Sequence, residues 1–273
     1  MIFIKKMSLF VIVLLSFLFI KCAGSRSSQT GELSFISIDE ELTLGEDISS
    51  FTLRYLDIIR NRTLNSFLNS MAKNIGAVSH WSGLPYSVFV INDHNINHFS
   101  LPGGNIYIFR GLLETAENSD EIAIILAHEI AHLTERDAVA RLAEKYGFSF
   151  AAQSVIGENP EIAEHIIMSL YKEGTILDYP AADEYRADQL ALEYVLKAGY
   201  NPKWLPVFLE KIAAIEKQTP DRTKLLQMTH PSIRSRIRKA QKNLKKLSLQ
   251  PNPPSPLPVS FQQAKQALAK IPG

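Results

Sequence analysis

Three ionisable side chains with the spacing of a zinc motif stand in an apolar stretch of the chain. His128, Glu129 and His132 form the pattern H-E-x-x-H within residues 122–134, which otherwise consist mainly of Ile, Leu and Ala. Asn118 and the acids after it are typical of a helix start, so a mostly buried helix is predicted. Burying three ionisable groups without a metal or other partners would cost several kcal/mol, which weighs against a chance pattern.

On a helix, the two histidines of this motif lie on one face. Residues four apart are separated by about 6 Å along the axis, so two neutral imidazoles can each give a nitrogen to one Zn²⁺. Glu129 is offset by about 100° and lies beside such a metal, where it can hold a metal-bound water. The motif therefore indicates metal-assisted hydrolysis.

A zinc site of this kind needs a third protein ligand and an open position for water. After His132 the chain runs Leu-Thr-Glu-Arg-Asp-Ala, without the histidine of the metzincin spacing. The best candidate is Glu184, four residues before Asp188 on a predicted helix. The two share a face, so Glu184 can ligate while Asp188 accepts a hydrogen bond from the far nitrogen of a zinc-binding histidine. An acidic pair on an exposed helix face is the alternative.

Four segments, in the same order as in the family, make the chain similar to the M48 family of zinc metallopeptidases, a group of gluzincins. Residues 97–113 resemble the family segment N-A-F-A-x-P-G-G-x-I-x-x-x-x-G-L-L, and the zinc motif follows. Residues 184–202 resemble E-x-x-A-D…A-G-Y-x-P, and residues 229–237 resemble T-H-P…R-I. The chain departs from the family at His98 and Ser100, which replace small alanines, and at Pro180-Ala181, where many members have Ser-Arg.

The resemblance implies a zinc metalloendopeptidase of the exported soluble or lipoprotein branch. His128, His132 and Glu184 would hold one Zn²⁺ per chain, Asp188 would support a ligand, and Glu129 would act as general base.

The resemblance also gives a role to the T-H-P segment. His230, with Arg236 in the same motif, would stabilise the developing oxyanion. His230 could instead bind the metal as a removable fourth ligand and keep the enzyme latent. A capping or surface histidine before Pro231 is the third reading.

Residues 106–109 are expected to form an edge strand on which an extended peptide pairs through its backbone. Such binding suits unfolded or misassembled cell-envelope proteins as substrates. The competing functions are a periplasmic chaperone or assembly factor with a latent or structural zinc site, and a metal-dependent hydrolase of a small ester or amide. The expected substrate-binding residues are Asn97, Gly103, Gly104, Ile106, Tyr107 and Ile108.

The elements that must position these residues predict an α+β fold that is predominantly helical. A zincin-like metallopeptidase core, with a small β-sheet beside the H-E-x-x-H helix, is expected over residues 39–247. Apolar periodicity predicts helices over 39–79, 183–198, 202–217 and 233–247, and strands over 86–91 and 106–109. Residues 142–178 show only weak helical character. Residues 248–273 are expected to form a Pro-rich linker and a short C-terminal helix.

The first 22 residues have the pattern of a signal peptide. Lys5 and Lys6 precede an apolar stretch that is short for a membrane span and of the length of a secretory signal. Cys22, the only cysteine, stands where lipoproteins are lipidated, and ordinary cleavage nearby is the alternative. Export to the bacterial periplasm, or a lipoprotein facing it, is expected, with residues 23–38 as a polar tether.

The remaining composition excludes some classes of site and partner. A single cysteine allows neither an intrachain disulfide nor a cysteine zinc site. A net charge of +1 suggests no nucleic-acid partner.

Overall fold

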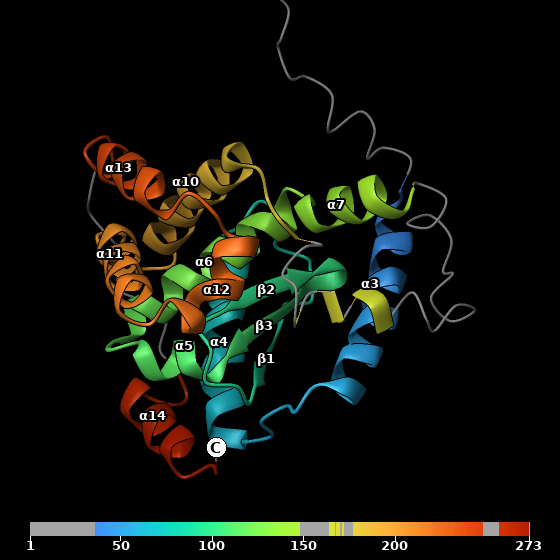
Figure 1. The fold of residues 1–273 in the computed structure, drawn as a ribbon, viewed down its shortest axis with the longest axis horizontal. Helices are drawn as coiled ribbons and strands as arrows, with labels where there is room; N and C mark the ends of the chain where they lie inside the picture. The colour runs from blue at the N-terminus through green and yellow to red at the C-terminus, as the bar shows by residue number, and fades with distance from the viewer. Residues whose placement is uncertain are drawn as a thin grey trace, which may run out of the picture. The chain divides into compact units, whose positions relative to one another are not determined.

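The H-E-x-x-H stretch forms helix α6 (Ser119–Thr134), around which the other elements pack (Figure 1). The helix begins as predicted, because the Asn118 Oδ1 accepts a hydrogen bond from the Glu121 main-chain N–H at 3.0 Å. Every residue from Glu121 to Leu133 is buried. The helix contacts α10 (Ala181–Lys197), α4 (Arg62–Gly76) and strand β2 (His98–Leu101). The zinc motif is therefore held by packing on several sides.

The structure, a computed structural model, describes residues 36–147, 164–166, 168, 169, 171, 177–247 and 257–272. The expected signal peptide with Cys22, most of the tether and most of the Pro-rich linker lie outside the described residues. Within the described ranges, none of the helices has the length and hydropathy that crossing a bilayer requires.

A three-stranded sheet lies beside α6, with the order β1-β3-β2 (Figure 1). Strand β1 (Ser87–Ile91) pairs in parallel with β3 (Asn105–Phe109), and β2 pairs antiparallel with the other side of β3. The prediction that residues 106–109 form an edge strand is therefore wrong. The side chains of Ile106, Tyr107 and Ile108 are fully buried, so neither their backbone nor their side chains are open to a substrate.

Two glycines make the tight connection between β2 and β3. Gly103 and Gly104 have φ values of 78° and 90°, in the region that favours glycine. A Cβ on Gly104 would lie 2.8 Å from the Pro85 carbonyl oxygen, and Gly103 packs against Gly45 of α3 (Ile38–Tyr55). Both are buried in the turn, and their expected contact with substrate stays a prediction.

The remaining helices complete a mainly helical α+β fold of the zincin-like type. The predicted helix over 39–79 is two helices, α3 and α4, and α10 was predicted within two residues. Helix α12 was not predicted, and α7 lies partly in the region of weak helical character. The other helices are α5 (Arg110–Thr115), α7 (Asp137–Tyr146), α11 (Trp204–Gln218), α12 (Pro220–Thr229), α13 (Ile233–Leu244) and α14 (Phe261–Ala269).

Candidate metal centre and active site

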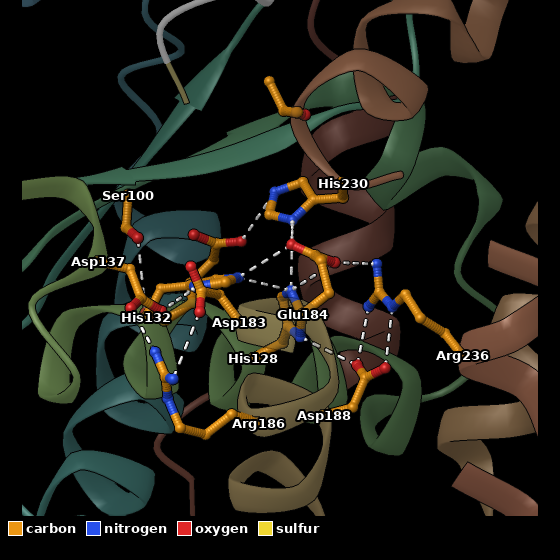
Figure 2. A network of polar contacts seen from close by, with 12 residues as sticks. Ser100, His128, His132, Asp137, Asp183, Glu184, Arg186, Asp188, His230 and Arg236 are labelled. Atoms are coloured by element: carbon orange, nitrogen blue, oxygen red, sulfur yellow. Dashed lines mark hydrogen bonds and ion pairs between the residues drawn. The ribbon is translucent and has the colours of Figure 1, made fainter. Parts of the chain in front are cut away.

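Three side chains predicted to ligate a metal come together in the structure (Figure 2). His128 and His132, one turn apart on α6, bring their Nε2 atoms within 3.1 Å of each other. Glu184, in the first turn of α10, places Oε1 3.3 Å from the His132 Nε2 and Oε2 3.7 Å from the His128 Nε2. All three side chains are buried. The four-residue spacing on α6 and the acidic start of α10 thus build one cluster.

The far nitrogens of both imidazoles contact carboxylates. The His132 Nδ1 donates to the Asp137 Oδ2 at 2.8 Å, and the His128 Nδ1 lies 3.1 Å from the Asp188 Oδ1. An ionised carboxylate only accepts, so the His132 Nδ1 carries the proton and its Nε2 presents a lone pair. Asp188 lies where it could support His128, and that role stays a prediction. Asp137, which supports His132, was not identified from the sequence.

The cluster fits a tetrahedral zinc ion. Two imidazole lone pairs and a carboxylate at such short distances repel one another unless a positive charge lies between them. Burial alone would lower the pKa of His132, but the carboxylates of Asp137 and Glu184, which face the ring, raise it to about 10. Zinc bonds of about 2.0–2.2 Å place tetrahedral ligand atoms about 3.3–3.6 Å apart, close to the spacing found here.

His230 joins this cluster from the C-terminal end of α12. Its Nδ1 lies 2.8 Å from the Glu184 Oε1 and 3.3 Å from the His128 Nε2, so it stands at the fourth corner. Its Nε2 faces the other way, 3.5 Å from the Glu129 Oε1. His230 is buried, which rules out the surface reading.

Arg236 does not have the catalytic position expected for it. Its Nε and Nη2 each donate to Asp188 at 2.8 Å, and its Nη1 lies 2.5 Å from the Glu184 Oε2. All three nitrogens of this buried guanidinium thus face carboxylates that ligate or support ligands. Arg236 is a positioning residue, because its guanidinium holds Asp188 and Glu184 of α10 in place (Figure 2).

Glu129 has the surroundings of an ionised base with one free oxygen. Its Oε1 lies 2.5 Å from the His98 Nδ1, whereas its Oε2 is buried without a hydrogen-bond partner. Burial would raise the pKa of Glu129, but the neighbouring His98 and His230 hold it well below its usual range. The free Oε2 can therefore accept a proton.

His98 lies on the other side of this carboxylate, and Asn97 directly precedes His98 at the start of β2. In the sequence, His98 stands out only as a departure from the family, since its contact with Glu129 depends on how β2 packs against α6. Asn97 is buried and its Oδ1 accepts a hydrogen bond from the Thr229 Oγ1 at 3.3 Å. This contact joins two of the family-like segments, and a role of Asn97 in substrate binding stays a prediction.

Comparison with known proteins places this centre in a family. The sequence profile of peptidase family M48 matches residues 59–244, which include every residue of the cluster. The chain is 29% identical to the mitochondrial metalloendopeptidase OMA1 of Schizosaccharomyces pombe, over 76% of this chain and 61% of the relative. It is 27% identical to the beta-barrel assembly-enhancing protease of Escherichia coli, over 76% of this chain and 44% of the relative.

A third relative is the putative beta-barrel assembly-enhancing protease of Vibrio cholerae, 27% identical over 75% of this chain and 44% of the relative. The chain thus spans about half the length of these curated relatives. The matched region covers more than half of the chain and carries both histidines, the base and the acidic ligand in the expected order. By its sequence and by the cluster built from it, the chain belongs to peptidase family M48.

Proposed function

We propose that the protein is a zinc-dependent metalloendopeptidase that hydrolyses peptide bonds of unfolded or misassembled cell-envelope proteins. The observation that carries this proposal is the free Oε2 of Glu129 beside the three-ligand cluster. A structural zinc site has no need of such a base, whereas hydrolysis requires one.

The residues of the centre have different roles in peptide hydrolysis. His128, His132 and Glu184 would hold the Zn²⁺, which when bound polarises the scissile carbonyl and acidifies the attacking water. Glu129 takes a proton from that water at Oε2 as the water attacks the carbonyl carbon. Glu129 then gives the proton to the leaving amine as the C–N bond breaks. Asp137 and Asp188 keep both imidazoles in the tautomer that ligates.

His230 stands at the position beside the three ligands where the attacking water would bind. This position supports the reading of His230 as a removable fourth ligand, so the arrangement corresponds to a closed, latent centre. Rotation of the imidazole away from Glu184 would open the corner. Once displaced, the ring can donate to the oxyanion of the substrate, which is the other role considered for it.

A narrow apolar pocket beside the centre indicates the side chains that a substrate presents. Its lining includes His128 and His230, and its one charged lining residue, Arg236, is paired with Asp188. A pocket of this composition favours an aliphatic side chain next to the scissile bond. The other lining residues are His98, Ile124, Ile125, Leu205, Phe208, Leu209, Ile212, Leu226 and Ile233.

The cellular setting is part of the proposal. We infer export through residues 1–22, with Cys22 lipidated or the signal cleaved nearby, so that the domain acts in the periplasm. The names of the bacterial relatives, which refer to β-barrel assembly, support an envelope substrate. Mass spectrometry of the mature N-terminus tests this: a free N-terminus with an intact signal would contradict export.

The closed corner also favours a second candidate function. Four protein donors around a zinc ion are typical of structural sites. An assembly factor that binds unfolded envelope proteins without cutting them would show such a site, and its chaperone activity would not depend on Glu129.

The decisive experiment compares the purified wild type with Glu129→Gln, which keeps the shape but removes the base. We expect about one zinc per chain in both, and casein cleavage only in the wild type, abolished by a chelator. Glu117→Gln, at an exposed position, should cleave like the wild type. Proteolysis retained in Glu129→Gln would contradict the mechanism. A wild type that suppresses aggregation but never cleaves would favour the assembly factor.

A further inference from the structure

The two ring nitrogens of His230 face two different clusters of metal-binding groups. Its Nδ1 faces the centre already described, and its Nε2 faces a second group formed with His98 and Glu129. One donor atom from each of these three residues lies within 4.8 Å of the other two. All three side chains are buried, and the roles described above for them involve no second metal ion.

The side chains of the second group lie close enough for rotation to bring their donor atoms around one divalent ion. The His98 Nδ1 lies 2.5 Å from the Glu129 Oε1, and the His230 Nε2 lies 3.5 Å from the same oxygen. The His98 and His230 rings are stacked, with centroids 4.4 Å apart and planes 29° apart. Rotation of the two rings can therefore bring one nitrogen of each to the same point beside the carboxylate. Two imidazoles and a carboxylate are a ligand set used for zinc.

The contacts of Glu129 also favour a metal site at this position. Its second oxygen, Oε2, is buried with no hydrogen-bond partner, so the carboxylate can turn to ligate without breaking another contact. His98 comes from β2, where its backbone is fixed in register opposite Ile108 of β3. A rigid strand thus presents the imidazole to the base, at a position where the family resemblance leads us to expect alanine.

We propose that His98, Glu129 and His230 form a second, weaker site for a divalent cation such as Zn²⁺, and that filling it inhibits the enzyme. Ligation by the His98 Nδ1 requires its proton to move to Nε2. A neutral imidazole has one lone pair, so His230 serves the second site only by leaving the first, which keeps its three other ligands. Glu129, bound to the second ion, is then unable to take the proton from water.

The charge in the region explains why the second site is the weaker one. Four buried carboxylates, Asp137, Asp188, Glu129 and Glu184, lie in this region; Arg236 pairs with Asp188 and Glu184, and Arg186 pairs with Asp137. A first divalent ion brings the summed charge of these groups to about zero, and a second ion adds positive charge that none of them balances. Binding of the second ion is therefore less favourable, since buried charge is costly unless balanced.

The test measures bound zinc and casein cleavage on the same full chain over a buffered range of free Zn²⁺. The wild type should bind one ion at low free zinc and a second at higher free zinc, with cleavage falling as the second binds. His98→Ala should bind only the first ion, and its cleavage should not fall at high zinc. His98→Asn, whose amide can still donate to Glu129 but ligates zinc poorly, should behave in the same way.

His94→Ala is the matched control, because His94 lies in the neighbouring loop and pairs only with exposed or half-exposed groups. It should bind both ions and be inhibited like the wild type. A second ion that persists in both His98 variants, or a wild type that binds one ion throughout, would overturn the proposal. The inhibition rests on the proposed role of Glu129, but the ion count does not, so a chain without any proteolysis still tests the site.

Discussion

At the scale of single residues, the centre depends on carboxylates that do not touch the metal. Asp137 fixes the His132 ring at 2.8 Å, and its other oxygen accepts from the Arg186 Nη2 at 2.6 Å (Figure 2). Asp188 contacts the His128 ring and is held in turn by Arg236. The far nitrogen of each imidazole in the cluster thus contacts a carboxylate, and an arginine pairs with that carboxylate. Such outer contacts set the tautomer and orientation of the ligands.

Removing one of these carboxylates tests whether the outer contacts matter. Asp137→Ala should weaken zinc binding by about 10–100-fold, because the His132 ring loses the acceptor that fixes its tautomer. Competition with a zinc-binding dye measures the affinity. Asp221→Ala, at an exposed position of α12, should bind zinc like the wild type. Equal affinity in wild type and Asp137→Ala would show that the ring is held by packing alone.

Sequence patterns identify the side chains of the cluster that could hold a metal but not all of their partners. His128, His132 and Glu184 are recognisable because helical spacing puts the two histidines on one face and the family-like segments come in a fixed order. Asp137 follows the last turn of α6, where its direction depends on Arg136, which has a positive φ of 59°. His98 meets Glu129 only through the packing of β2 on α6. Such contacts between distant segments leave no local periodicity.

At the scale of elements, the apolar pocket is made where α6, α11, α12 and α13 meet. Helix α12 breaks at His230 and α13 begins at Ile233, so the connection between them closes one side of the pocket. Because α12 was not predicted, neither was the pocket. The strands show the same limit: β1 and β3 have β-branched residues, whereas β2 is four residues long and carries His98 and Ser100. Strand order depends on pairing partners, which explains the wrong placement of β3 at an edge.

The pocket predicts a preference among substrates. In a series of otherwise identical peptides, Leu beside the scissile bond should give kcat/KM at least about tenfold above Ala, since each buried methylene is worth about 1–3 kcal/mol of discrimination. Asp at the same place should be cleaved more slowly than Ala, because the pocket offers no free cation. Mass-spectrometric mapping of the cleavage sites gives the rates. Equal cleavage of all three peptides would show that the pocket takes no part in recognition.

At the scale of the whole molecule, the C-terminal segment is held to the core by two cations, the buried Arg110 and the half-buried Lys265. Arg110 donates to the carbonyl oxygens of Pro272 and Ile271 at 2.7 and 2.9 Å. The Lys265 Nζ, on α14, donates to the Leu113, Glu114 and Ala116 carbonyl oxygens at 2.8–3.0 Å, at the C-terminal end of α5. A cation there satisfies carbonyls that the helix leaves unpaired. Helix α14 is thus part of the folded unit, as its packing on α4 also shows.

Loss of the Lys265 charge should loosen this attachment. Lys265→Met should lower Tm, because three carbonyl oxygens lose their donor while the apolar part of the side chain is kept. Lys270→Met, at an exposed position just beyond α14, should leave Tm nearly unchanged. Differential scanning calorimetry of both variants measures the difference. The same Tm in the two variants would mean that α14 is held by its apolar face alone.

The most direct test of the account counts zinc at low free metal in the wild type and in Glu184→Gln. Glu184 lies about fifty residues after His132 in the sequence, and its carboxylate lies within 3.7 Å of the Nε2 atoms of both imidazoles, as a shared ion requires. We predict about one zinc per wild-type chain and little or none in the variant, with both chains folded by circular dichroism. A wild type without zinc, or a variant that keeps its full zinc content, would contradict the central claim.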